Sequence, residues 1–250
     1  MDPLISIITP VYNASPFLKE TIKSVKDQTF KDWEWIIVDD CSSDSSVDII
    51  ISFASGDSRI HLIRLDINSG TGVAKNTALR HARGRFITFI DSDDLWKPEK
   101  LELQVNFMMD NNYPISFTSY VVMDQSGRDK DKIISVKSSV NQHQYLKNTI
   151  IGFSTSMIDK NITGSFEFIG LRSREDTHLW ITLLGKGFIA YGLNKVLTRY
   201  RVHDHSITSN KLKAARQTWE LYHKIEKLGC FRSVYYFGHY AFNAFKKHYF

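Results

Sequence analysis

The stretch Phe86-Ile87-Thr88-Phe89-Ile90-Asp91-Ser92-Asp93-Asp94 passes directly from five apolar or β-branched residues to three carboxylates. Such a run is typical of a strand buried on both faces in a parallel sheet, and ligands of these sheets bind at the carboxyl ends of the strands. Carboxylates this close repel unless a cation lies among them, and Mg²⁺ or Mn²⁺ binds a few carboxylates together with substrate phosphates. The alternative is a solvated helix N-cap before Leu95-Trp96-Lys97-Pro98.

Working outward, the same kind of run recurs three times before this strand. The runs are Leu4–Thr9, Trp33–Val38 and Ile60–Leu65. Helical patterns separate them, with Ser15-Pro16 as the N-cap and first-turn proline of the first helix. Strands that alternate with helices predict an α/β fold, here a doubly wound sheet.

The pattern changes after Tyr113-Pro114. A hairpin around Asp124–Gly127 is followed by short strands and helices, and the last forty residues favour two helices broken at Gly229. We therefore expect a nucleotide-binding half over residues 1–112, a second half of the same domain over 113–210, and a helical tail over 211–250.

Composition limits the compartment and the partners. The 250 residues are 42% hydrophobic and 24% charged, enough for a globular core, and the two cysteines, Cys41 and Cys230, form no metal-ligand spacing. Neither a signal peptide nor an apolar run of ~18 residues is visible. We therefore expect a protein on the cytoplasmic side of the membrane.

The tail carries the charge. Residues 211–250 hold eight Lys or Arg against two Glu, so they account for +6 of a formal net charge of +5 and leave the rest at −1. Aromatic residues alternate with these bases, which is typical of a helix at a membrane interface, whereas nucleic-acid binding is not expected from a nearly neutral body. The alternative is that the aromatics pack on the body.

Three other segments follow predicted strands. They are Thr9-Pro10-Val11-Tyr12-Asn13, Val38-Asp39-Asp40-Cys41-Ser42, and Asn68-Ser69-Gly70-Thr71-Gly72-Val73-Ala74-Lys75-Asn76. A tyrosine face can stack on a base, a carboxylate can accept from a uracil or ribose, and glycines before a helix can bring backbone N–H groups to a phosphate. Read singly, each is also ordinary turn or cap chemistry.

In this order the four segments resemble the family-2 glycosyltransferases of GT-A fold, over roughly Leu4 to Ser209. The resemblance implies a nucleotide-sugar site made by the first three segments, with Thr9, Tyr12, Asn68 and Gly70 among its residues and Asp40 or Asp39 on the base. It implies a divalent Mn²⁺ or Mg²⁺ ion on the Asp-x-Asp pair, with Asp91 on the ribose or metal and Asp93 on the metal. Lys75 stands where the family commonly has Arg, which keeps the charge but loses the bidentate fork.

Two motifs of the second half complete this site. Glu175-Asp176 opens a predicted helix, where acidic residues are ordinary complements to the helix dipole. The resemblance instead implies that this pair carries the catalytic base, by match Asp176. In Tyr200-Arg201-Val202-His203-Asp204-His205 a histidine is by itself a packed or solvated residue, but the family often completes its metal site here, which matches His203 better than His205.

The resemblance implies an inverting, metal-dependent transfer of one hexose or N-acetylhexosamine, most simply from a UDP-sugar, to an acceptor hydroxyl. No Gln-x-x-Arg-Trp signature of processive members is present. With the basic tail, we expect a lipid-linked or oligosaccharide acceptor, surface-polysaccharide assembly, and a peripheral position on the inner face of the cell membrane. The alternatives are a sugar-phosphate nucleotidyltransferase, which lacks its glycine-rich basic loop here, and a non-catalytic membrane- or carbohydrate-binding protein on the same fold.

Overall fold

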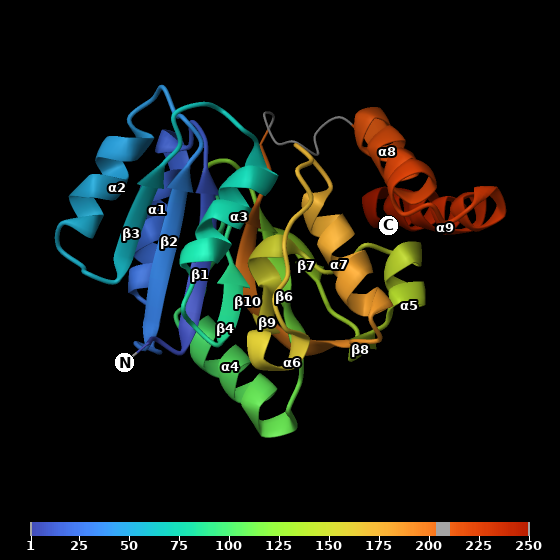
Figure 1. The fold of residues 1–250 in the computed structure, drawn as a ribbon, viewed down its shortest axis with the longest axis horizontal. Helices are drawn as coiled ribbons and strands as arrows, with labels where there is room; N and C mark the ends of the chain where they lie inside the picture. Colours follow the sequence, from blue (N-terminus) through green and yellow to red (C-terminus); the bar gives the residue numbers. More distant parts are fainter. Residues whose placement is uncertain (1, 204–210, 250) are drawn as a thin grey trace.

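The computed structural model describes residues 2–203 and 211–249, with the side chains of 211, 212 and 245–249 left aside. One central sheet runs through both halves in the order β3-β2-β1-β4-β9-β6-β10-β5, with helices on both faces (Figure 1). The sheet is mixed, so the expected α/β doubly wound architecture is confirmed.

The first half forms as its apolar runs predict. Strands β1 (Ile5–Val11), β2 (Trp33–Asp39), β3 (Ile60–Arg64) and β4 (Phe86–Phe89) are mutually parallel where they pair. Every residue of β1, β2 and β4 is buried, which explains their unbroken apolar composition. Helices α1 (Ser15–Lys26), α2 (Ser46–Ala54) and α3 (Thr71–His81) connect them. The carboxyl ends of these strands therefore meet at one rim.

The second half mixes parallel and antiparallel strands. Strand β9 (Ser156–Asp159) lies between β4 and β6 (Ile115–Met123) and is antiparallel to both. Strand β10 (Ala190–Arg201) is parallel to β6. The other elements of this half are β7 (Asp129–Ile134), β8 (Ser139–Val140), α5 (Gln142–Lys147), η1 (Phe153–Thr155), α6 (Lys160–Thr163) and α7 (Glu175–Gly185). The first half ends with β5 (Leu95–Trp96) and α4 (Lys100–Asn111).

Two apolar clusters, one on each face of the sheet, hold the layers together. One joins the sheet to α1, α2 and α4 through Leu18, Ile50 and Leu101. The other joins it to α3, α5 and α7 through Ala74, Leu146 and Trp180, and it extends to Tyr222 and Tyr236 of the tail. Because α3 and α7 share this second cluster, the starts of these two helices are held at the same rim.

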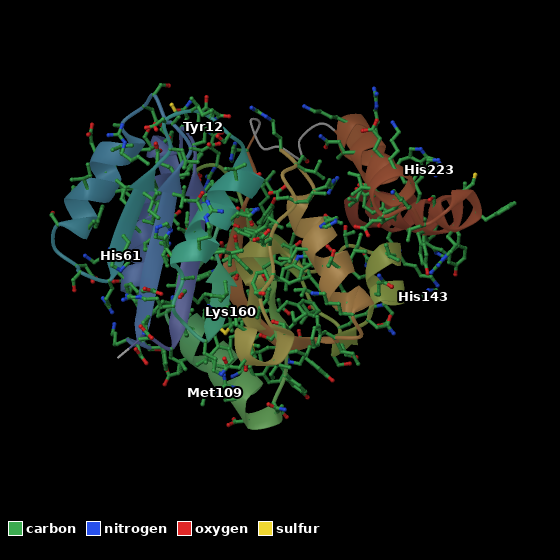
Figure 2. The ribbon with its side chains drawn as sticks, viewed as in Figure 1. Tyr12, His61, Met109, His143, Lys160 and His223 are labelled. Atoms are coloured by element: carbon green, nitrogen blue, oxygen red, sulfur yellow. The ribbon has the colours of Figure 1, made fainter. Side chains whose placement is uncertain are left out.

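The tail packs on the body with one face. It consists of α8 (Lys211–Glu220), a π-helical turn (Leu221–Ile225) and α9 (Cys230–Tyr249), beside α5 and α7 (Figure 1). The Tyr222 hydroxyl donates to the Leu146 carbonyl at 2.8 Å, and the Tyr236 hydroxyl lies 2.8 Å from Nδ1 of His143, which Figure 2 shows beside the tail. The packing alternative is therefore realised for this face.

The other face of α9 carries apolar side chains in contact with solvent. We call these the α9 stripe; they are Phe231, Val234, Tyr235 and Phe242, of which Tyr235 lies at the edge, with the Lys147 ammonium of α5 5.1 Å from its ring centroid. Spacings of three, four and seven residues place them along one side of the helix. None of the helices in the described part of the chain is long and apolar enough to span a membrane.

Candidate active site at the carboxyl rim of the sheet

The candidate residues gather where β1, β2 and β4 end, and where α3 and α7 begin. Figure 2 shows Tyr12 at this rim and Lys160 towards the opposite end of the strands. The Tyr12 side chain is 52% exposed, so its ring is open to a ligand. The next residue, Asn13, has a φ of 48°, and its Oδ1 accepts from the backbone N–H of Ser43 at 2.8 Å. The turns after β1 and β2 are thereby tied together.

Thr9 lies beneath this rim. Its side chain is fully buried, and its hydroxyl oxygen accepts a hydrogen bond from Nε1 of Trp35 at 2.9 Å. The structure therefore places the Thr9 hydroxyl in the core between β1 and β2. Any ligand contact at Thr9 has to come from its backbone.

The two aspartates that end β2 have different surroundings. Both carboxylate oxygens of Asp40 accept backbone hydrogen bonds, from Ser69 at 2.7 Å and Gly70 at 2.8 Å. Asn68 donates to the Asp40 carbonyl at 3.2 Å. Asp40 thus holds the Asn68–Gly70 turn, in which Gly70 has a φ of 92° that disfavours any side chain. Asp39 instead uses one oxygen for the Ser42 N–H, at 3.0 Å, and its buried Oδ1 accepts from no described residue.

Lys75 and Glu175 form a buried ion pair across the rim. The Lys75 ammonium donates to Oε1 of Glu175 at 2.7 Å and lies 3.7 Å above the ring of Phe153. Burial opposes its charge, but Glu175, Asp91 and Asp176 together raise the pKa of Lys75. Burial by itself would raise the pKa of Glu175. Attraction to Lys75 and hydrogen bonds from Lys75 and Thr71 outweigh this effect, so the pKa of Glu175 lies below its usual value. Both side chains are therefore charged and committed to each other.

The acidic loop, which we define as Asp91–Asp94, follows β4 as predicted. The Asp91 N–H donates to Oγ of Ser154 at 2.9 Å. Burial raises the pKa of Asp91 to about 7; Lys75 opposes this rise, and the carboxylates of Asp93 and Asp176 add to it. Burial also raises the pKa of Asp94 well above its usual range, together with Asp93 and Asp91. The loop therefore concentrates more negative charge than its protein neighbours neutralise.

His203 closes over the acidic loop from β10. Its Nε2 lies 2.9 Å from Oδ2 of Asp93, and its ring centroid lies 5.1 Å from that of Phe17 in α1. The structure thus brings together Asp93 and the histidine that the sequence placed with it, 110 residues apart. His205, the other histidine of the motif, lies outside the described residues.

These donors suit a divalent cation that shares its coordination with phosphates. No group of three or more His, Cys, Asp or Glu side chains in the described chain is arranged to hold a metal alone. However, Mg²⁺ in nucleotide enzymes takes one or two carboxylates and leaves the other positions to phosphate and water. Oδ2 of Asp93 and Nε2 of His203 lie 2.9 Å apart, so one carboxylate and one imidazole are close enough to bind the same ion. Burial and neighbouring carboxylates raise the pKa of Asp91, and a bound cation would lower it again by stabilising the ionised form.

Asp176 occupies the first turn of α7, next to this charge. Its Oδ1 accepts from the N–H of Thr177 at 2.7 Å, and its side chain remains partly accessible. Burial raises the pKa of Asp176, and the neighbouring Glu175 adds to this, while Lys75 and Arg174 oppose it. Of the two acids at this helix start, Asp176 is the one that remains open to a ligand.

Three residues of this region were given no role from sequence. Ser154 anchors Asp91, and the buried Arg201 binds the acidic loop. Arg172 lies over Gly70 and donates to Oδ1 of Asn68 at 3.3 Å. Ser154 and Arg172 have no sequence signal, whereas Arg201 lies two residues before His203, inside a motif that the sequence already singles out.

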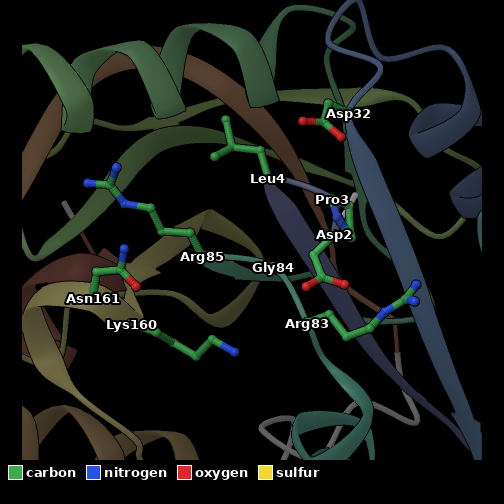
Figure 3. Close-up of a pocket in the computed structure, with 9 residues that line it drawn as sticks. All are labelled: Asp2, Pro3, Leu4, Asp32, Arg83, Gly84, Arg85, Lys160 and Asn161. Atoms are coloured by element: carbon green, nitrogen blue, oxygen red, sulfur yellow. The ribbon is translucent and has the colours of Figure 1, made fainter.

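A cavity lies at the opposite rim, where the strands begin (Figure 3). Its volume is about 380 Å³ and its lining includes Arg83, Arg85 and Lys160. These cations already have partners, because Arg83 pairs with Glu34, Arg85 pairs with Asp159, and Lys160 donates to the Ala82 carbonyl. The three basic side chains of this cavity are therefore already engaged within the protein.

Comparison with known proteins agrees with this geometry. The family model described as glycosyl transferase family 2 matches residues 6–169. The chain is 48% identical over 245 residues to the putative teichuronic acid biosynthesis glycosyltransferase TuaG of Bacillus subtilis, covering 98% of this chain and 97% of that protein. It is 35% identical over 248 residues to the UDP-Glc:alpha-D-GlcNAc-diphosphoundecaprenol beta-1,3-glucosyltransferase WfgD of Escherichia coli, covering 99% and 96%.

Solved structures share the fold. S. aureus TarS (1–349) in complex with UDP-GlcNAc superposes with a TM-score of 0.67 at 20% identity, over 88% of this chain and 66% of that one. The mannosyltransferase PcManGT from Pyrobaculum calidifontis, in complex with GDP-Man and Mn²⁺, gives 0.70 at 19% identity, over 92% and 66%. The present chain spans about two thirds of each. On the family match and these relatives, the chain belongs to glycosyl transferase family 2, and its fold is that of the GT-A glycosyltransferases.

Proposed function

We propose that this glycosyltransferase moves one hexose or N-acetylhexosamine from a UDP-sugar to an acceptor hydroxyl, with inversion at the anomeric carbon. The observation that carries the proposal is the position of Asp176. This partly accessible carboxylate lies in the first turn of α7, next to Glu175, whose 2.7 Å ion pair with Lys75 of α3 holds the helix start at the rim where the acidic loop follows β4. A base and a candidate cation site are then on one rim, which is what a direct displacement of a nucleoside diphosphate requires.

For the nucleotide, the geometry favours Asp39 over Asp40 as the residue that binds the base. Asp39 has a buried carboxylate oxygen that no described residue satisfies, and an imide N–H of uracil would satisfy it. Both oxygens of Asp40 already hold Ser69 and Gly70. Tyr12 offers its exposed ring for stacking, and the Asn68–Gly70 turn forms the adjacent wall. The TarS structures with UDP and UDP-GlcNAc support a uridine nucleotide.

For the metal, we assign Asp93 and His203 as ligands, with Asp91 beside them on the metal or the ribose. Mn²⁺ or Mg²⁺ would act there as a Lewis acid that neutralises the departing diphosphate. The Mn²⁺ in the PcManGT complex supports this choice. Lys75 is 4% exposed, so we assign it to holding Glu175 rather than to the phosphates.

For the transfer, Asp176 takes the proton of the acceptor hydroxyl. As the acceptor oxygen forms its bond to the anomeric carbon, the bond from that carbon to the diphosphate breaks on the opposite side, and the diphosphate leaves with the electron pair. A single displacement inverts the configuration. The raised pKa of Asp176 makes it a stronger proton acceptor than an exposed aspartate.

For the acceptor, we propose a lipid-linked or oligosaccharide substrate in surface-polysaccharide assembly. The support is the diphosphoundecaprenol substrate named for WfgD and the teichuronic acid pathway named for TuaG. The α9 stripe and the +6 charge of the tail fit a peripheral position on the inner face of an anionic membrane.

Calorimetric binding of UDP with Mn²⁺ and with EDTA tests the metal and nucleotide assignments together. Asp93→Asn should lose the gain in UDP affinity that Mn²⁺ provides and keep the affinity measured in EDTA. Asp131→Asn, on exposed β7, is the matched control and should behave as wild type. Equal UDP affinity of Asp93→Asn and wild type in Mn²⁺ would remove the metal from the proposal.

The second candidate is a non-catalytic binding protein on the same fold. The partly accessible Asp176 and the intact acidic loop favour catalysis. Hydrolysis or transfer of any UDP-sugar by wild type, lost in Asp176→Asn, separates the two.

A further inference from the structure

Arg201 ends β10 two residues before His203, and its side chain is only 1% exposed. A buried guanidinium is costly unless its N–H groups find acceptors. Here Nε donates to the Asp93 carbonyl at 2.7 Å and Nη1 to the Gln125 carbonyl at 3.0 Å. Nη2 donates to Oε2 of Glu20 at 2.6 Å. One side chain thus joins the acidic loop, the turn of the β6–β7 hairpin and α1.

The backbone of Arg201 is tied to the same loop. Its N–H donates to Oδ1 of the buried Asp94 at 2.8 Å. Arg201 therefore donates two hydrogen bonds to the acidic loop, one to the Asp93 carbonyl and one to the Asp94 carboxylate. Both contacts lie next to the side chain of Asp93, which would bind the metal.

Phe17 of α1 extends the arrangement to the histidine. The Arg201 guanidinium lies 4.9 Å from the Phe17 ring centroid, and the His203 ring lies 5.1 Å from the same centroid. The position of His203 is thus set by the end of β10 on one side and by Phe17 on the other. Metal binding needs donor atoms within a few tenths of an ångström of their places, so this support has a direct consequence for the site.

We propose that Arg201 is a positioning residue that holds His203 against Asp93 and so completes the metal site. The proposal rests on the assignment of Asp93 and His203 as metal ligands made above. Arg201 itself does not touch the metal, because its donors are occupied by Asp93, Gln125 and Glu20.

Arg199 provides a matched control on the same strand. It also binds the hairpin, with Nε donating to Oδ1 of Asp129 and Nη2 to the Gly127 carbonyl, both at 2.7 Å. Its hydrogen bonds stay on the hairpin and do not reach the acidic loop. Replacing Arg199 therefore removes a comparable arginine–hairpin contact without touching the proposed support of His203.

The experiment is Mn²⁺ binding in the presence of UDP, followed by electron spin echo spectroscopy. An imidazole ligand gives the Mn²⁺ signal a nitrogen modulation, which the phosphates of UDP cannot supply. Wild type and Arg199→Lys should show this modulation, and His203→Ala should lose it. Arg201→Lys keeps the positive charge but loses the several N–H donors of the guanidinium. This variant should lose the nitrogen modulation and bind Mn²⁺ about 10- to 100-fold more weakly, which is the usual effect of replacing a residue that supports a metal ligand. UDP affinity in EDTA should be unchanged.

The outcomes separate this inference from the proposed function. A wild-type complex without nitrogen modulation contradicts the assignment of His203 as a ligand. Modulation in wild type that persists at full strength in Arg201→Lys contradicts the positioning role, as does an equal loss in Arg199→Lys or an equal fall in UDP affinity with EDTA. If Arg201→Lys does not fold, Glu20→Ala replaces it; that variant removes one acceptor at a half-exposed residue and should weaken Mn²⁺ binding measurably, and no weakening would overturn the proposal.

Discussion

The ammonium of Lys75 lies 2.7 Å from Oε1 of Glu175, and this ion pair joins the second turn of α3 to the first turn of α7 across the candidate active site. The two helices start about a hundred residues apart in the chain. Because both side chains are buried, the pair fixes the place of Glu175 and with it the helix start that carries Asp176.

Lys75→Met should lower the free energy of unfolding by about 3–5 kcal/mol, because it leaves the Glu175 carboxylate buried without its partner. Urea unfolding measures this loss. Lys100→Met is the matched control: Lys100 is fully buried, donates to the Thr88 hydroxyl at 2.6 Å, and has a pKa that burial lowers well below its usual value. Adding Glu175→Gln to Lys75→Met should recover part of the loss. If Lys75→Met and Lys100→Met lower the free energy of unfolding equally, the ion pair with Glu175 does not account for the effect of Lys75→Met.

Asp176→Asn should reduce turnover by at least ~10²-fold and leave UDP affinity and stability near wild type, because the amide cannot take the acceptor proton. The control is Asp48→Asn, which also replaces an aspartate in the first turn of a helix, α2, and lies away from the acidic loop. Initial rates of sugar transfer and calorimetric UDP binding decide the point. Turnover near wild type in Asp176→Asn would direct the search for the base to Glu175.

The parts of the fold that sequence could predict are those in which a segment's environment is uniform. The runs that became β1, β2 and β4 are buried on both faces, so their composition alone identified them. The acidic loop followed for the same reason, since it begins where an apolar run stops. The reversal at β9 had no such signal, because strand direction depends on the partner and not on local composition.

Site roles were harder to predict where a side chain serves the protein itself. Asp39 and Asp40 are adjacent and identical in type, and their hydrogen bonds in the folded chain distinguish them: Ser69 and Gly70 occupy both oxygens of Asp40, whereas Oδ1 of Asp39 has no described donor. Lys75 suits a phosphate on charge alone, and its burial against Glu175 depends on a residue a hundred positions away. Local patterns cannot contain contacts of this range.

Glu226 predicts a pH-dependent stability. Burial raises the pKa of its carboxyl to about 7 from 4.5, and one of its oxygens accepts from no described residue. The folded protein therefore keeps a proton that the unfolded chain loses above pH 4.5, so stability falls as pH rises from about 4.5 to about 7, by about 3 kcal/mol in total. Glu226→Gln should remove this share of the fall in urea unfolding between pH 4 and pH 8, and the share due to the raised pKa values of Asp91 and Asp176 should remain.

The neighbour of Glu226 acts in the opposite sense. Nε2 of His178 lies 3.8 Å from Oε1 of Glu226, and burial lowers the pKa of this histidine, so its contribution to stability is lost as pH falls below about 6.5. The difference between Glu226→Gln and wild type isolates the glutamate. Glu220→Gln, in exposed ion pairs with Arg216 and Lys224, should keep the wild-type profile. A Glu226→Gln profile parallel to wild type would contradict the buried-acid interpretation.

The last prediction concerns the α9 stripe. Its side chains are exposed to solvent, and binding to a membrane would bury them. Phe231 is 92% exposed and Phe242 67% exposed, on a helix whose opposite face is docked on α5. Removing the tail at Leu228 would also remove the contacts of Tyr236 and Asn243 with the body, so loss of membrane binding could not be distinguished from loss of packing. Phe231→Ser with Phe242→Ser leaves those contacts in place.

The double variant should bind anionic vesicles at least ~10-fold more weakly than wild type, because burying each phenylalanine contributes about 1.5–3 kcal/mol. High salt should weaken wild type further, because the tail carries +6. Ile133→Ser, at a residue 60% exposed on β7, is the matched control and should sediment with vesicles as wild type does. UDP affinity should be the same in all three proteins, because the nucleotide residues lie before β10. If wild type and the double variant sediment equally with anionic vesicles, the α9 stripe does not contact lipid. Any membrane binding would then come from the positive charge of the tail alone.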